Sequence, residues 1–340
     1  MQASPFPLGL VVALGIVLLV SRPWLDARRP IMSLALILGV ALGPVGGNLV
    51  REDLLSGMTP VSALCSGWLA LLAAESWDAV TLRRARSSFR ILWLVVPAVA
   101  LGWYFGAILI ACAAIALDPD AAREGLRLMV RPTTGARLAP TIAAIALGLA
   151  LLASCLADPR GLLVGTPALL IGAALGLIYA GLLRLADGRA LVLTLLITLP
   201  ILGAGIAHAL EVPVFATFFV AGLLLAQDTA RRDLIFSALR EYERPVTAAL
   251  LLLAGVSLPL SGEVAASWPF WVAAVILVLI KPVAWRLVPA GGLVWRQVLP
   301  MSPLVIPLAA ATGVPWIAAA VALAFVLGEL LSRLPERRTT

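Results

Sequence analysis

The chain is poor in the residues that most enzymes use for chemistry. Its 340 residues include one histidine, His208, and three cysteines, Cys65, Cys112 and Cys155, each isolated in an apolar run without metal-ligand spacing. No phosphate loop, dinucleotide fingerprint, H-E-x-x-H or G-x-S-x-G motif occurs. We therefore expect neither an enzyme nor a bound cofactor or metal. We interpret the cysteines as small core residues and His208 as a hydrogen-bonded packing residue, the alternative for His208 being a proton relay.

Charge is also scarce. Only 13% of the residues are charged and 62% are hydrophobic, with a mean hydropathy of +1.05, which predicts an all-α polytopic membrane protein. We expect one transmembrane domain over 1–334, with approximate halves 1–157 and 161–334, and a short basic cytoplasmic tail at 335–340. No soluble domain is expected. The net charge of +7 is assigned to loops that orient the chain in the lipid bilayer, so nucleic-acid binding is not expected.

Twelve apolar runs recur along the chain, and about 20 apolar residues cross a bilayer as a helix. The first run lacks a basic n-region and a small-residue cleavage site, so it is predicted to be a spanning helix and not a signal peptide. The runs lie at about 7–21, 31–50, 60–77, 91–117, 139–157, 161–183, 190–210, 212–227, 245–261, 267–288, 299–311 and 314–332.

Arginines occupy alternate loops within each half of the chain, as the positive-inside rule predicts. If each apolar run crosses the membrane once, however, the arginine-rich loops of the two halves lie on opposite sides. A double crossing of 91–130, interrupted at Asp118-Pro119, removes the disagreement because proline disfavours helix at the residue before it. The sequence then predicts about 12–13 helices, with the N-terminus outside and the C-terminus inside. The loop arginines are at 22, 28 and 29, at 83, 84, 86 and 90, at 184 and 189, at 231, 232, 240 and 244, at 286 and 296, and at 333, 337 and 338.

Prolines and glycines mark further features of the apolar runs. LPMSPLVIPLAAATGVPW at 299–316 has four prolines and is a second candidate for a discontinuous helix, the alternative being an ordinary proline-kinked one. Paired broken helices are typical of secondary transporters. GWYFG at 102–106, GLLVG at 161–165 and GAALG at 172–176 predict close helix packing in lipid.

Lys281 is the only lysine among 25 lysine and arginine residues, and it lies within the apolar segment WPFWVAAVILVLIKPVAWRLV at 268–288. Burial disfavours the charged form of a lysine and a nearby carboxylate favours it, so the charge of such a side chain responds to what binds beside it. The alternative is snorkelling toward the interface near Arg286, about 7.5 Å away along the helix at about 1.5 Å per residue.

Several motifs, in their order along the chain, resemble the monovalent cation:proton antiporter superfamily, in its Kef-like and NapA-like sodium/hydrogen exchanger branch. The resemblance covers nearly the whole chain. The segments that carry it are ILGVALGP at 37–44, LALLAAESWDAVTLRRAR at 69–86, AIALDPD at 114–120, VFATFFVAGLLLAQ at 214–227 and LVLIKPVAWRL at 277–287.

This resemblance implies an antiporter-like fold of thirteen helices in two inverted repeats with crossed broken helices, and a homodimer. It also implies exchange of Na⁺ or K⁺ for H⁺ through a lysine paired with a core aspartate. The chain departs from the family in the helix after the first broken one, LAPTIAAIALGLALLASCLADPRG at 138–161. That helix lacks the usual Asp-Asp or Asn-Asp pair. The usual acidic segment of the last broken helix is also missing, unless LGELL around Glu329 is a displaced remnant.

Three acids are candidate partners of Lys281 in ion and proton coupling. Asp118 is the first choice, because a broken helix exposes backbone carbonyls beside it; the alternative is an acid in a surface turn. Asp158 lies in LADPRG and is alternatively a helix-end residue. Glu75, at the edge of an apolar run, is either an interfacial acid or a core group.

We therefore expect a secondary active transporter that exchanges a monovalent cation for protons, in a membrane that we take to be a bacterial inner (plasma) membrane. The alternative is a transport-inactive membrane scaffold or partner subunit that retains the antiporter fold. A membrane-embedded carboxylate near the crossing of the broken helices would favour the transporter, and purely apolar surroundings of Lys281 would favour the scaffold.

Overall fold

The structure, a computed structural model, describes residues 32–44, 46–47, 50, 52–75, 161–186, 188–227, 232–258, 262–287, 305–310 and 315–332. Within these ranges the chain forms α-helices and turns and no strand. The helices are α2 (Met32–Leu42), α3 (Glu52–Ala74), α9 (Gly161–Leu185), α10 (Arg189–Ala209), α11 (Val214–Gln227), α12 (Arg232–Glu241), α13 (Glu243–Val256), α14 (Gly262–Ala266), α15 (Trp268–Leu287), α17 (Val305–Ala310) and α18 (Pro315–Ser332).

Four of the described helices are long and apolar enough to cross a membrane. The segments are Gly57–Ala74, Thr166–Leu185, Ala190–Ala209 and Pro315–Ser332. Large apolar side chains remain exposed along α9, α10 and α15, among them Leu170, Leu177 and Leu279. Such surfaces are unfavourable in water and suit a hydrocarbon solvent. The prediction of an all-α polytopic membrane protein is confirmed.

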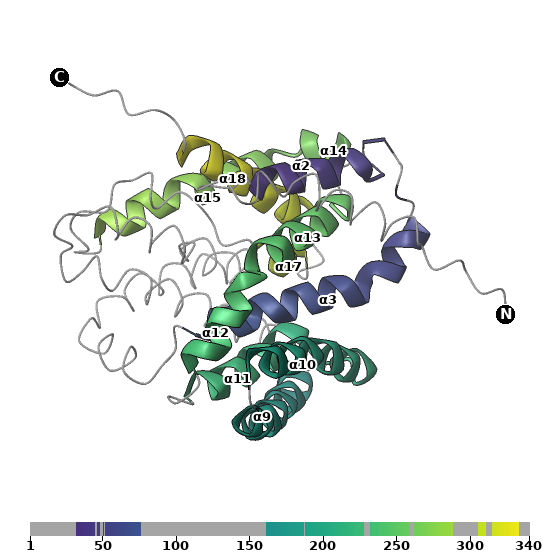
Figure 1. The fold of residues 1–340 in the computed structure, drawn as a ribbon. Coiled ribbons are helices and arrows are strands. Elements are labelled where there is room, and N and C mark those ends of the chain that lie inside the picture. Colours follow the sequence, from purple (N-terminus) through teal and green to yellow (C-terminus); the bar gives the residue numbers. More distant parts are fainter. Residues whose placement is uncertain are drawn as a thin grey trace.

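The helices pack as two groups joined by a central pair (Figure 1). In the first group α11 packs against α9 and α10, and in the second α2, α14, α15 and α17 surround α18. Between them, α3 contacts α11 and α10 on one side and α13 on the other, while α13 contacts α2 and α17. The short helix α12 joins α11 to α13 along the chain.

Glycines allow the closest approaches between helices. A Cβ at Gly39 of α2 would lie 2.9 Å from the Cα of Gly255 on α13, and it would overlap the carbonyl oxygen of Leu252. In the predicted GAALG face, Gly172 meets the backbone of Thr217, and a Cβ at Gly176 would lie 3.0 Å from the Cα of Ala221. Small residues therefore place backbones in contact, as expected where lipid competes for apolar side chains.

These contacts also fix the directions of the helices. Gly172 and Gly176 of α9 meet Thr217 and Ala221 of α11 in the same order, so the two helices run parallel. Along α3, Gly67 contacts Phe218 and Leu71 contacts Gly222 of α11, again in the same order. Consequently the C-terminal ends of α3, α9 and α11 all lie on the same side of the protein.

Three local predictions can be compared with the structure. Cys65 is buried, as predicted. His208, predicted to be a packing residue, is exposed at the end of α10, which contradicts that interpretation. The arginine-rich segment after α11, predicted to be a loop, contains α12. Its apolar residues Ile235 and Leu239 are four positions apart, so they share one buried face of the helix. This short amphipathic pattern differs from the continuous apolar runs that predict membrane-spanning helices.

Alanine at Gly39 or Gly255 should destabilise the protein by about 1–3 kcal/mol, the usual effect of overpacking. Gly181 on α9 is the control, because no heavy atom lies within 4 Å of the position that its Cβ would occupy. There alanine should be neutral or stabilising, since it is the better helix former. Thermal unfolding in detergent, followed by tryptophan fluorescence, measures all three. Equal midpoints for Gly39→Ala and Gly181→Ala would contradict the proposed close crossing.

Candidate functional site

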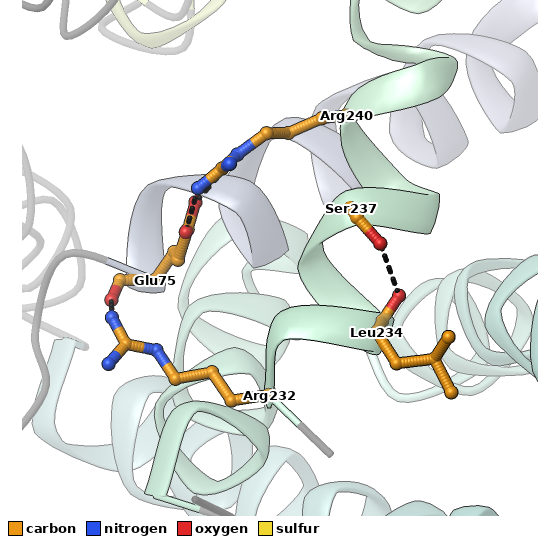
Figure 2. A network of polar contacts seen from close by, with 5 residues as sticks. All are labelled: Glu75, Arg232, Leu234, Ser237 and Arg240. Atoms are coloured by element: carbon orange, nitrogen blue, oxygen red, sulfur yellow. Dashed lines mark hydrogen bonds and ion pairs between the residues drawn. The ribbon is translucent and has the colours of Figure 1, made fainter.

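Glu75 follows the last residue of α3, and its side chain faces α12. The Nε–H of Arg240 donates to Oε2 of Glu75 at 3.2 Å, and the Nη2 group of the same arginine donates to Oε1 and forms an ion pair (Figure 2). Both carboxylate oxygens are thus bound by one guanidinium group, the geometry that arginine offers to carboxylates. The residue is only 8% exposed, so this pairing compensates for burial of its charge.

A second arginine binds the backbone of Glu75. The Nη2 group of Arg232 donates to the carbonyl oxygen of Glu75 at 3.0 Å (Figure 2). That oxygen lies at the end of α3, where carbonyl groups lack partners within the helix and a cation is favourable. Arg232 is the first residue of α12 and Arg240 lies in its last turn, so α12 is held to α3 near both of its ends.

Aromatic contacts complete the junction. The indole Nε1–H of Trp68 donates to the carbonyl oxygen of Leu239 at 3.1 Å. Its ring also packs edge-on against Tyr242, with ring centroids 6.0 Å apart. Tyr242 is the one residue between α12 and α13, so α3 contacts both helices at their joint.

Lys281 lies on α15, six residues before that helix ends. Phe270, Ala274 and Leu277 form the buried stripe of the described part of α15. The exposed stripe instead contains Val275 and Leu279. The side chain of Lys281 lies outside the described part of α15, so its predicted role stays a prediction.

The remaining predicted site residues, Asp118 and Asp158, lie outside the described residues, and their roles stay predictions. The same holds for the first broken helix and for most of the second candidate at 299–316. In that second segment α17 ends at Ala310 and α18 begins at Pro315. Within the described ranges no cluster of three or more histidine, cysteine, aspartate or glutamate side chains could hold a metal ion.

Glu329, which the sequence suggested only as a displaced remnant, has a defined structural role. Its carboxylate accepts hydrogen bonds from the backbone N–H groups of Met32 at 3.0 Å and Ser33 at 2.6 Å. Met32 is the first residue of α2, where N–H groups lack partners within the helix. A residue of α18 thus caps α2 from nearly 300 positions away, and no local capping pattern in the sequence could have revealed this.

The described helices define an all-α polytopic membrane protein with an antiporter-like fold. A solved structure with this fold is that of the sodium proton antiporter MjNhaP1 from Methanocaldococcus jannaschii at pH 8. The TM-score is 0.63 at 16% sequence identity, over 95% of this chain and 94% of that one. No protein-family model matches the sequence, and no curated protein is similar to it. The likeness therefore establishes the fold.

Removing the Glu329 carboxylate should destabilise α2 by about 0.5–2 kcal/mol, the usual effect of losing an N-terminal cap. Glu329→Gln should lose less than Glu329→Ala, because an amide oxygen still accepts a hydrogen bond while the favourable charge is lost. The control is Glu263→Ala, at an exposed acid of α14. Thermal unfolding compares the three variants. A Glu329→Ala midpoint equal to that of the control would contradict the capping role.

Proposed function

We propose that the protein is a secondary active transporter of the monovalent cation:proton antiporter superfamily, which exchanges Na⁺ or K⁺ for H⁺. The main support is the antiporter fold, shared over almost the whole chain with a sodium proton antiporter. The motifs at 37–44, 69–86, 114–120, 214–227 and 277–287 support the proposal through their resemblance to this superfamily.

We further propose that Lys281 and Asp118 form the coupling pair, with Asp158 as the second candidate acid. The support for Lys281 is its place as the one lysine of the chain, within the apolar segment at 268–288 that resembles the family's lysine-bearing helix. A carboxylate there can bind either a proton or a cation, and a lysine can neutralise it when neither is bound. Glu75 is the weakest of the three acids for this role, since its carboxylate is bound by Arg240.

The helix directions support the thirteen-crossing topology. Because α3 and α9 run parallel, we expect an odd number of crossings in the chain between them. Residues 76–160, which lie outside the described part, contain two apolar runs, at 91–117 and 139–157. The proposed double crossing within 91–130 supplies the third passage.

The same contacts support the proposed orientation in a bacterial inner membrane. Glu75 joins the end of α3 to α12, and Glu329 joins the end of α18 to the start of α2. The parallel crossing of α2 and α13, with Gly43 at the end of one against Val256 at the end of the other, puts these junctions on one side. Arginines flank that side in the sequence, so we assign it to the cytoplasm. A homodimer remains part of the proposal through the resemblance alone.

The competing proposal is a transport-inactive scaffold or partner subunit. It is favoured by the absence of the family's acidic pair from the helix at 138–161. Among the described residues, Glu75 is the only charged side chain that is buried, and it is already paired. A functional assay of the purified protein separates the two proposals.

Transport is tested in proteoliposomes with an internal pH-sensitive dye that reports H⁺ movement on addition of Na⁺, K⁺ or Li⁺. We expect a cation-dependent signal for the wild type, none for Asp118→Asn, and an altered signal for Lys281→Ala. Lys281→Arg keeps the charge but does not deprotonate at physiological pH, so it should alter the pH dependence of exchange. Glu263→Gln, at an exposed acid, is the matched control. Folded, inserted wild-type protein that gives no signal with any of these ions would exclude cation antiport.

A further inference from the structure

The short helix α12 is the direct link between helices that belong to different packing groups. It follows α11, which packs against α9 and α10, and it is joined through Tyr242 to α13, which packs against α2. Figure 1 shows α12 and α13 between these two groups. A displacement of one group relative to the other would therefore involve α12 as well as the contacts of α3 with α11 and α13.

Helix α12 packs chiefly against α10, and three hydrogen bonds join it to the end of α3. Arg240 binds the carboxylate of Glu75, Arg232 binds its carbonyl oxygen, and Trp68 donates to Leu239. Beneath these polar contacts, Ile235, Phe236, Ala238 and Leu239 form the buried face of α12. One residue, Glu75, thus accepts hydrogen bonds from both ends of the helix.

The two partners of the ion pair differ in their exposure. The Arg240 side chain is 43% exposed, whereas the Glu75 side chain is only 11% exposed. The guanidinium group can exchange the carboxylate for water or lipid headgroups at modest cost, because it is already half in the interface. The carboxylate, in contrast, loses the compensation for its burial when the pair opens. Such a contact favours the closed arrangement and still permits opening.

We propose that Glu75 and Arg240 form a latch that fixes α12, and through it the relative position of α11 and α13, so that Glu75 is a positioning residue and not an ion ligand. The part of this proposal that concerns transport depends on the proposed antiport. During exchange the latch holds the resting arrangement of the two helix groups. Its removal changes how fast the protein turns over and leaves the affinity for the cation intact.

Hydrogen exchange followed by mass spectrometry tests the latch without any transported solute. In protein reconstituted in lipid nanodiscs, Glu75→Gln and Arg240→Gln should each speed exchange of the α12 amides by about tenfold, equivalent to ~1.4 kcal/mol. Because the two side chains act through each other, the double variant should exchange no faster than either single variant. Arg240→Lys, which keeps the charge but not the two-point geometry, should lie between them and the wild type.

Asp233→Asn is the matched control, since Asp233 is exposed on the same helix. Exchange in Glu75→Gln equal to that in Asp233→Asn would overturn the latch, as would effects of the single variants that simply add in the double variant.

The second measurement is the dependence of transport rate on cation concentration in proteoliposomes. With the latch removed by Glu75→Gln, Vmax should change while KM stays within about twofold of the wild-type value, because one kilocalorie of lost binding would already move KM about fivefold. A tenfold higher KM with unchanged Vmax would overturn the proposal and make Glu75 an ion ligand. If the wild type moves no cation, the proposed antiport fails, whereas hydrogen exchange at α12 still decides whether the latch exists.

Discussion

Apolar helices gain little by leaving lipid for one another, because the acyl chains are as apolar as the side chains. Association then depends on how closely the backbones approach, and in this protein glycines permit the closest approaches. Phe218 of α11 fits against Gly67 of α3 and Gly203 of α10, where any Cβ would collide with its ring. The helix directions, and hence the side on which each helix ends, follow from these contacts.

Two acids of the described part, Glu75 and Glu329, connect helix ends on one side of the protein. Glu75 and Glu329 each bind groups of a helix that is distant in sequence, an arginine pair in one case and two backbone N–H groups in the other. A carboxylate at a membrane interface is kept where it completes such interactions. Both acids therefore hold helix ends in place, and the proposed coupling chemistry is left to Lys281 and the acids between α3 and α9.

The membrane-spanning nature of the protein and most of its helices could be predicted, because a spanning helix requires about 20 consecutive apolar residues, a feature of the local sequence. The predicted runs at 190–210, 267–288 and 314–332 agree with α10, α15 and α18 within two residues. The predicted loop after α11 was wrong, because a helix that does not span the membrane need not have about 20 apolar residues. Ten residues with four arginine or acidic side chains among them form α12, because their apolar positions share one face that packs on the protein and not on lipid.

The sequence by itself determined that the protein lies in a lipid bilayer, where its long helices are and that its one lysine lies in an apolar segment. Each of these features depends on composition or local periodicity. Only the tertiary structure decided the partners of the acids. Glu75 meets Arg240 across 165 residues, and Glu329 meets Met32 across 297. Such pairs arise from the crossing of helices whose order in space is independent of their separation along the chain, so no local pattern encodes them.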